Sequence, residues 1–176
     1  PNKSDAPTVK AAVDAENAIL KGQVPSAVLR LGFVYGGGSA ALESLMVTLR
    51  RGRFVPLDEA PVNWIHELDA AEAVRRVTEA MPAGEIFNVV DDTPVSTADF
   101  DAQFAQAMGL QAPGKGLQFL SLFCLGDFTQ NVAKTPVMCS NTKIKSALGW
   151  RPIYPTQKNG IEQALLTWRA AEAVDS

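Results

Sequence analysis

An alternation of short apolar runs with helical segments is the feature that most constrains how this chain folds. Residues 25–34 and 85–90 are short, mainly apolar runs, and the first contains β-branched residues. Such runs are typical of strands that are buried on both faces of a parallel sheet. The segments 40–51 and 69–81 between them are predicted as helices. This order of elements predicts an α/β fold.

Glycines and capping residues delimit the other elements. Further helices are predicted over residues 11–21, 97–108, 141–148 and 161–174, and short strands over residues 54–57 and 62–65. Ser39 and Ser96 are predicted N-caps. The most apolar segment, residues 117–128, is predicted as a helix that packs on a subdomain or forms an interface. The pattern becomes mostly helical after Pro94, so a boundary is predicted between residues 93 and 94.

Composition narrows the classes of partner. Sixteen Lys and Arg against nineteen Asp and Glu give a net charge of −3, which argues against nucleic acid because phosphate binding needs clustered cations. No apolar run approaches the length needed to span a bilayer, so no membrane partner is expected. Cys124 and Cys139 do not have metal-ligand spacing, and no metal site is expected. Free thiols and a cytoplasmic location are favoured over a disulfide.

A glycine-rich turn offers one specific alternative. Residues 36–41 match G-x-G-x-x-A between a predicted strand and a predicted helix, and Asp58 follows at a suitable distance. Taken literally, this pattern is a cradle for the pyrophosphate of a dinucleotide, with Asp58 on the ribose. The other interpretation is a loop at the carboxyl edge of the sheet, where ligands of open α/β sheets bind. The loop is a candidate site in both interpretations.

Several single residues also allow a structural and a functional interpretation. Arg30 in an apolar strand needs a partner, and an ion pair with Glu16 competes with a phosphate or sugar contact. His66, the only histidine, either opens a helix or acts as a general base. Tyr35 either forms a hydrogen bond to substrate or packs over the hydrophobic core. Lys143 either reaches a diphosphate or is solvated.

Five islands of sequence resemble the extended short-chain dehydrogenase/reductase family, which contains nucleotide-sugar epimerases and dehydratases. They are Glu16, in the helix that follows the catalytic Tyr-x-x-x-Lys of that family; residues 30–38, similar to LRP-x-x-x-YGPG; residues 64–69, similar to W-I-H-V-x-D; residues 84–91, similar to GEIYNVVD; and residues 140–152, similar to S-N-x-K-x-x-x-LGW-x-P. Their order and spacing match the second half of such an enzyme.

The resemblance implies a partial Rossmann-like fold, in which late parallel strands with flanking helices are joined by a small, mostly helical substrate subdomain. Residues 1–93 would be the remnant of the dinucleotide-binding domain, and residues 94–176 the substrate-binding subdomain. The implied cofactor is NAD or NADP, and the implied substrate is a nucleotide sugar or similar molecule. Implied cofactor contacts are Leu31, Gly32, Phe33 and Tyr35, and implied substrate contacts are Arg30, Gly36, Gly38, Trp64, His66, Asn141 and Lys143.

The departures from the family pattern limit the expected activity. With Glu16 aligned, the catalytic Tyr position falls on Thr8 and the Lys position on Ala12, and neither side chain replaces the acid/base dyad. We therefore expect the substrate-side portion of an NAD(P)-dependent epimerase, dehydratase or reductase, without a complete active site of its own. The alternative is a small non-catalytic binding or interaction protein, expected to be a homodimer, built on the same scaffold.

Overall fold

The computed structural model describes residues 7–51, 60–111 and 138–174, and it is a mixed α/β structure, as the sequence predicts. The described helices are α1 (Pro7–Leu20), α2 (Ala40–Arg50), α3 (Glu67–Ala80), α4 (Thr97–Ala107), α7 (Thr142–Leu148) and α8 (Gln157–Val174). The strands are β1 (Val28–Leu31), β2 (Phe33–Tyr35), β3 (Pro61–Val62), β4 (Trp64–His66), β5 (Ile86–Val89) and β6 (Val95–Ser96). The elements predicted at 54–57 and 117–128 lie outside the described residues.

The predicted strand over residues 25–34 divides into two strands with different neighbours. β1 pairs in parallel with β5, and β2 pairs in parallel with β4. The change of partner occurs at Gly32, whose amide donates to the carbonyl of Val89, while the next amide, of Phe33, donates to Asn63. A Cβ at Gly32 would lie 2.8 Å from the carbonyl oxygen of Asn63, so the backbones approach too closely for a side chain.

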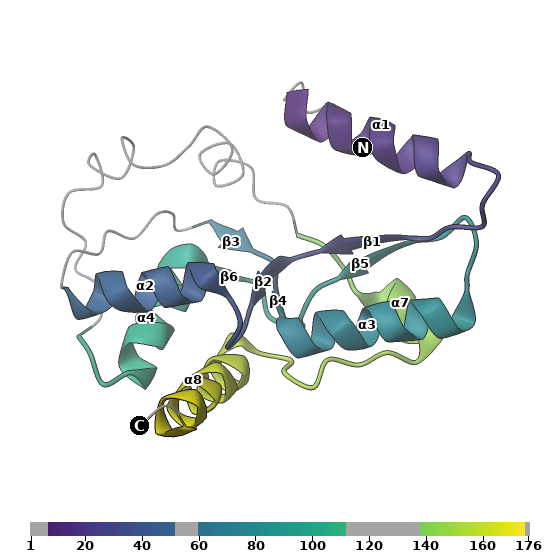
Figure 1. Cartoon of the computed structure of the whole chain (residues 1–176). Helices are drawn as coiled ribbons and strands as arrows, with labels where there is room; N and C mark the ends of the chain where they lie inside the picture. The colour runs from purple at the N-terminus through teal and green to yellow at the C-terminus, as the bar shows by residue number, and fades with distance from the viewer. Residues whose placement is uncertain (1–6, 52–59, 112–137, 175–176) are drawn as a thin grey trace.

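The helices cover the strands in two groups. α3 and α7 lie on one side of the β1–β5 pair and α1 lies on the other, whereas α2, α4 and α8 gather beside β2, β4 and the antiparallel pair β3–β6 (Figure 1). Ser39 and Ser96 cap α2 and α4 by accepting from the amides of Leu42 and Asp99, as predicted. α8 begins at Gln157, four residues before the predicted helix.

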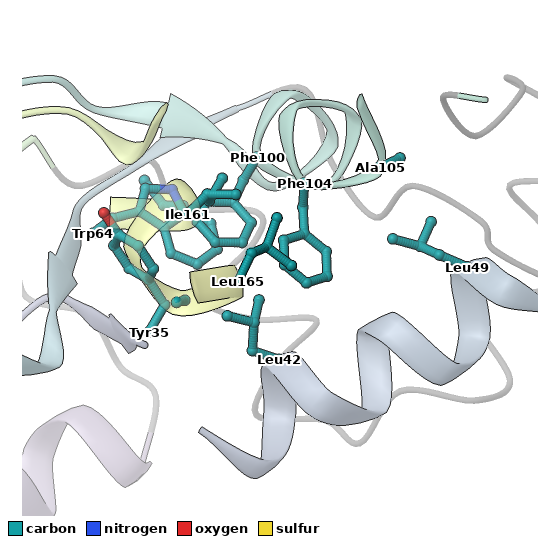
Figure 2. Close-up of a cluster of buried hydrophobic side chains, with 11 residues drawn as sticks. Tyr35, Leu42, Leu49, Trp64, Phe100, Phe104, Ala105, Ile161 and Leu165 are labelled. Carbon is teal, nitrogen blue, oxygen red and sulfur yellow. The ribbon is translucent and has the colours of Figure 1, made fainter. Parts of the chain in front are cut away.

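Two buried clusters form the core. The first joins Tyr35 and Trp64 to α2, α4 and α8, with the ring of Trp64 stacked on Phe100 at 3.9 Å between centroids (Figure 2). The second joins Ile65 and Phe87 to α3, α7 and Trp150. Each cluster combines residues from both sides of position 94, so the two segments 1–93 and 94–176 share both parts of the core.

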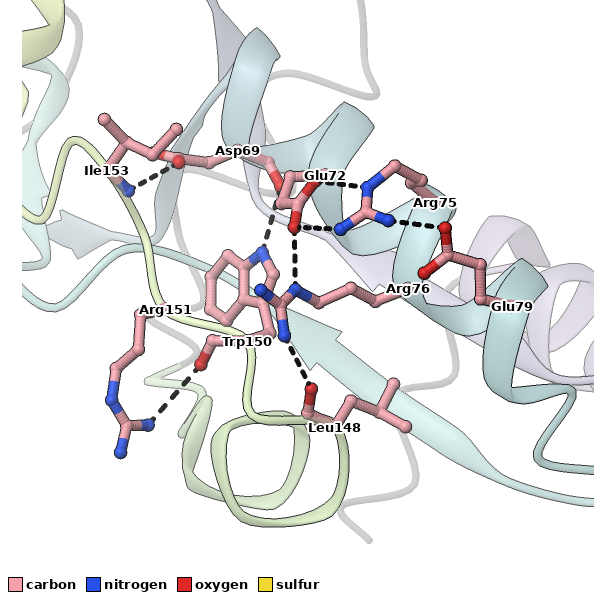
Figure 3. Close-up of polar contacts among 9 residues, drawn as sticks. All are labelled: Asp69, Glu72, Arg75, Arg76, Glu79, Leu148, Trp150, Arg151 and Ile153. Carbon is pink, nitrogen blue, oxygen red and sulfur yellow. Dashed lines mark hydrogen bonds and ion pairs between the residues drawn. The ribbon is translucent and has the colours of Figure 1, made fainter.

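Asp69 links α3 to the segment that connects α7 with α8. Its carboxylate is fully buried and accepts the amides of Ile153 at 2.6 Å and Tyr154 at 3.0 Å. Its backbone carbonyl accepts the indole N–H of Trp150, as Figure 3 shows. Burial raises the pKa of this carboxyl group, and the two amide hydrogen bonds oppose the rise. One side chain therefore fixes the path of the chain toward α8.

Replacing Gly32 by alanine is expected to lower the free energy of unfolding by about 1–3 kcal/mol, because the nearest atoms are backbone atoms that cannot move aside. Urea denaturation measures the change. Gly38→Ala is the matched control, because its Cβ would meet the flexible carboxylate of Glu67 at 3.2 Å. Equal effects of the two substitutions would show that the close approach at Gly32 does not matter.

Asp69→Ala is expected to cost about 3 kcal/mol, since it leaves the amides of Ile153 and Tyr154 without an acceptor in the protein interior. Chemical denaturation of this variant, compared with Asp14→Ala on the exposed surface of α1, measures the cost. A loss no larger than that of the control, within about 0.5 kcal/mol, would mean that water satisfies both amides.

Candidate site at the carboxyl ends of strands β2 and β4

The carboxyl ends of β2 and β4 bring together four of the residues that the sequence singles out. Tyr35 and His66 are paired at the last position of the two parallel strands. Gly36 and Gly38 follow Tyr35 directly, and α3 begins directly after His66. Ligands of open α/β sheets bind outside the carboxyl ends of the strands, so this edge is the candidate site.

The loop of residues 36–38 is enclosed on two sides. A Cβ at Gly36 would lie 2.2 Å from the carboxyl carbon of Glu67, and a Cβ at Gly37 would lie 2.8 Å from the Thr167 side chain of α8. The carbonyl of Gly37 accepts the indole N–H of Trp168 at 2.6 Å. A side chain at Gly36 or Gly37 would therefore have to displace the side chain of Glu67 or of Thr167.

Glu67 already places a negative charge in the loop. The amide of Gly38 donates to both of its carboxylate oxygens, at 3.2 and 3.3 Å. The amide of Ser39 donates to the carbonyl of Gly36. A pyrophosphate cradle needs free amides at this position, so the geometry does not favour that interpretation of the loop. Asp58, its proposed ribose ligand, lies outside the described residues.

Glu67 is a residue that the sequence reasoning overlooked. The available signal was its position: a carboxylate in the first turn of a predicted helix, directly after the only histidine. The helix dipole favours a negative charge there. It also stands where the similar motif W-I-H-V-x-D has Val.

His66 and Tyr35 are both buried beneath α8. The Nδ1 atom of His66 accepts from the amide of Leu68, so His66 caps α3. Burial lowers the pKa of the imidazole, which favours the neutral ring with its proton on Nε2. A Cβ at Gly160 would lie 2.2 Å from the Tyr35 hydroxyl oxygen, which shows how tightly α8 packs on it. Within the described residues, the hydroxyl of Tyr35 and Nε2 of His66 have no well-formed hydrogen bond.

The residues after β5 form a second polar cluster. The carboxylate of Asp91 accepts the amide of Thr93 at 3.2 Å and the side-chain amide of Gln157 at 2.7 Å. Burial of this carboxylate raises the pKa of Asp91 to about 7. Burial likewise raises the pKa of Asp101, on α4, to about 7.

Asn141 and Lys143 are used within the fold. The amide nitrogen of Asn141 donates to Val90 at 2.8 Å and to Asp92 at 2.7 Å, and thereby ties the start of α7 to the chain after β5. Lys143 pairs with Glu85 at 2.7 Å and donates to the carbonyl of Ile86 at 2.9 Å, at the amino end of β5. Its ammonium group therefore lies at the opposite end of that strand from the candidate site.

The remaining candidates lie along β1, β2 and β4. Arg30 forms two hydrogen bonds to Glu16, at 2.8 and 2.5 Å, so the expected ion pair is confirmed, although the arginine side chain is half-exposed. Leu31 and Phe33 flank Gly32 and are 45% and 39% exposed. Trp64 is buried, and its indole N–H donates to the carbonyl of Val95.

The described residues hold no candidate for two other kinds of site. No helix among them is both long and apolar enough to span a bilayer. No group of three His, Cys, Asp or Glu side chains in the same ranges is arranged to hold a metal ion.

The raised pKa of Asp91 predicts that the protein loses stability as the pH rises. The carboxyl group binds its proton more tightly when folded, so its contribution is complete below its unfolded pKa, near 3.8, and is lost through about pH 7. Between pH 5 and 8, the wild type is expected to lose about 2 kcal/mol more than Asp91→Asn. Urea denaturation at the two pH values measures both. Equal losses would exclude Asp91 as the cause.

Known proteins similar to this chain agree on the fold. No family model matches the sequence. A 3-diazoavenalumate denitrifying reductase from a Streptomyces species is 28% identical over 166 residues, which are 92% of this chain and 54% of the reductase. A conserved protein of unknown function from Silicibacter pomeroyi is 26% identical, with a TM-score of 0.67 over 90% of this chain and 53% of that structure.

Two enzyme structures extend the comparison. The WbmF enzyme of Bordetella bronchiseptica, solved with NAD+ and UDP, is 18% identical, with a TM-score of 0.67 over 98% of this chain and 56% of its own. The dTDP-glucose 4,6-dehydratase of Bacillus anthracis, solved with NAD, is 17% identical, with a TM-score of 0.65 over 93% of this chain and 50% of its own. This chain therefore has the fold of about half of an NAD-dependent epimerase/dehydratase of the short-chain dehydrogenase/reductase type.

Proposed function

We propose that this chain is the substrate-side portion of an NAD(P)-dependent epimerase, dehydratase or reductase, and that it needs a cofactor-binding portion to form a complete active site. The observation that carries the proposal is a group of exposed apolar side chains on β1, β2 and α1, here named the apolar face. Leu31, Phe33 and Val34 of the two strands are 39–45% exposed. Val9, Val13 and Ile19 of α1 are exposed as well.

The edge of β1 supports the same proposal. Among the described residues, β1 pairs with β5 on one side and with no strand on the other. An unpaired edge beside exposed apolar side chains is a template for a further strand. The chain spans about half the length of the relatives reported above, so another α/β portion of comparable size is the occupant that this face fits.

The cofactor would lie beside this face and not within the glycine loop. Leu31, Gly32 and Phe33 lie where the chain passes from β1, which pairs with β5, to β2, which pairs with β4. This position suits a contact with one end of a dinucleotide. The diphosphate would need another loop, since Glu67 holds the amide of Gly38. We propose that Tyr35, Gly36, Gly38 and His66 shape the substrate end of the site.

Two substrate classes compete. The UDP bound to WbmF and the name of the dTDP-glucose dehydratase support a nucleotide sugar or a similar polar molecule. The higher identity to the Streptomyces enzyme favours a second candidate, the reduction of a small molecule that is not a sugar. Arg30, Trp64, Asn141 and Lys143 were predicted as substrate contacts. Their use in ion pairs, core packing and backbone hydrogen bonds favours a supporting role.

The alternative is a non-catalytic binding protein in which the apolar face pairs with a second copy. The same exposed residues support this alternative. The oligomeric state in solution distinguishes the two proposals. The substrate-side proposal predicts a monomer by sedimentation, whereas the alternative predicts a dimer that Leu31→Asp dissociates.

Titration of the purified chain with NADH and NADPH by calorimetry tests the proposal directly. We expect no saturable binding at millimolar cofactor, because the described residues form no diphosphate cradle. The variant Glu67→Gln keeps the shape of the side chain without its charge and is the matched control for the loop. Micromolar binding by the unmodified chain would contradict the proposal. It would indicate residues 36–38 as the candidate cofactor-binding loop.

A further inference from the structure

Gly160, Gln163 and Thr167 form one stripe of α8 that lies over the candidate site. A Cβ at Gly160 would lie 2.2 Å from the Tyr35 hydroxyl oxygen. A Cβ at Gly37, in the glycine loop, would lie 2.8 Å from the Thr167 side chain. Residues three and four apart on a helix share a face. Gln163 therefore lies between the points at which α8 meets Tyr35 and the glycine loop.

Thr167 sets the orientation of the Gln163 side chain. The side-chain amide nitrogen of Gln163 donates to Oγ1 of Thr167 at 2.9 Å, and that hydroxyl donates to the backbone carbonyl of Gln163 at 3.2 Å. Because the nitrogen faces Thr167, the amide oxygen, Oε1, lies on the other side of the amide group. Oε1 is buried and has no well-formed hydrogen bond within the described residues. Gln163 therefore offers a buried hydrogen-bond acceptor.

His66 offers the complementary donor. Its Nδ1 atom accepts from the amide of Leu68 at 3.3 Å, which places the proton of the neutral ring on Nε2. The ring is fully buried and stands at 88° to the ring of Tyr35, at 5.3 Å between centroids. Nε2 is buried as well and lacks a well-formed hydrogen bond in the part of the chain that the structure describes. A buried donor of this kind is costly unless it finds an acceptor.

The electrostatics of His66 bring the donor and the acceptor together. Burial lowers the pKa of the imidazole, and the charges of Asp69 and Glu67 oppose the fall. Gln163 opposes it as well, through a loosely aligned hydrogen bond from the ring, so its oxygen faces Nε2. We propose that Gln163 is a positioning residue, which accepts the Nε2 proton of His66 and holds the ring as one neutral tautomer.

This role connects the two parts of the candidate site. The hydrogen bonds run from the start of α3 through His66 and Gln163 to Thr167, which touches the glycine loop. Both nitrogens of His66 then serve the fold, which is the opposite of a ring that acts as a general base. The inference deepens the proposed function, and it rests on that proposal for the statement that His66 belongs to the substrate end of a site.

NMR of the imidazole nitrogens tests the proposal, and the signals are unambiguous because His66 is the only histidine of the 176-residue chain. In the wild type we expect a neutral ring protonated on Nε2, with a proton that exchanges slowly with water. Gln163→Met keeps the length of the side chain without its acceptor. In this variant we expect the proton to exchange at least about fivefold faster, as the loss of one hydrogen bond implies. We also expect a lower pKa for His66.

Three further variants separate the acceptor from general effects. Gln163→Glu restores an acceptor with a negative charge, so we expect a protected Nε2 proton and a higher pKa of His66 than in the wild type. Thr167→Val removes the group that orients the amide, so we expect faster exchange, with a smaller effect than in Gln163→Met. Gln106→Met is the same substitution on an exposed position of α4 and is expected to give the wild-type signals.

Two results would overturn the proposal: a wild-type ring protonated on Nδ1, or an unchanged Nε2 proton in Gln163→Met. Equal effects in Gln163→Met and Gln106→Met would also overturn it, since the acceptor would then play no part. Thermal unfolding of each variant verifies that the fold is retained, and Thr167→Val carries the test if Gln163→Met does not fold. The spectra are recorded without cofactor, so a failure here leaves the calorimetric test of the proposed function unaffected.

Discussion

The buried carboxylate of Asp69 is the interaction on which the arrangement of the candidate site depends. It holds the amides of Ile153 and Tyr154 and thereby directs the chain into α8. α8 in turn covers the Tyr35 hydroxyl through Gly160 and closes the glycine loop through Trp168. The loop, the end of β2 and the end of β4 are therefore positioned by an acid that lies outside the candidate site itself.

The sequence predicted the order of strands and helices, because apolar runs and helix caps are local patterns. The expectation that residues 25–34 are buried on both faces was wrong, since Leu31, Phe33 and Val34 are 39–45% exposed. Ser39 and Ser96 cap their helices as expected. Arg30 pairs with Glu16 as expected, but the reason given for the pair, the cost of burying an unpaired charge, does not hold because the arginine side chain is half-exposed. The break at Gly32 was not predicted, since it arises from the approach of Asn63, a contact between residues far apart in the chain. The strand β6 was missed because two residues carry no periodic pattern.

The candidate site was harder to predict than the fold. Tyr35, Gly36, Gly38 and His66 meet because β2 and β4 are parallel neighbours, a pairing that the sequence does not state. Glu67 was overlooked because its role depends on the position of a loop from another strand. For Asn141 and Lys143 the residue type suggested ligand contacts, whereas the structure shows their hydrogen bonds to the chain around β5. The boundary at residue 94 remains a prediction, although both core clusters cross it.

Our central proposal is that the outer edge of β1, which pairs with no strand among the described residues, binds a further α/β portion. The amides of Val28 and Gly32 donate toward β5, so the alternation along a strand directs those of Leu29 and Leu31 to the open edge. Amide hydrogen exchange of the isolated chain, measured residue by residue by NMR, tests this claim most directly. We expect fast exchange at Leu29 and Leu31 and slow exchange at Arg30 and Gly32. Equal protection at all four amides would contradict it, because the edge would then already be covered.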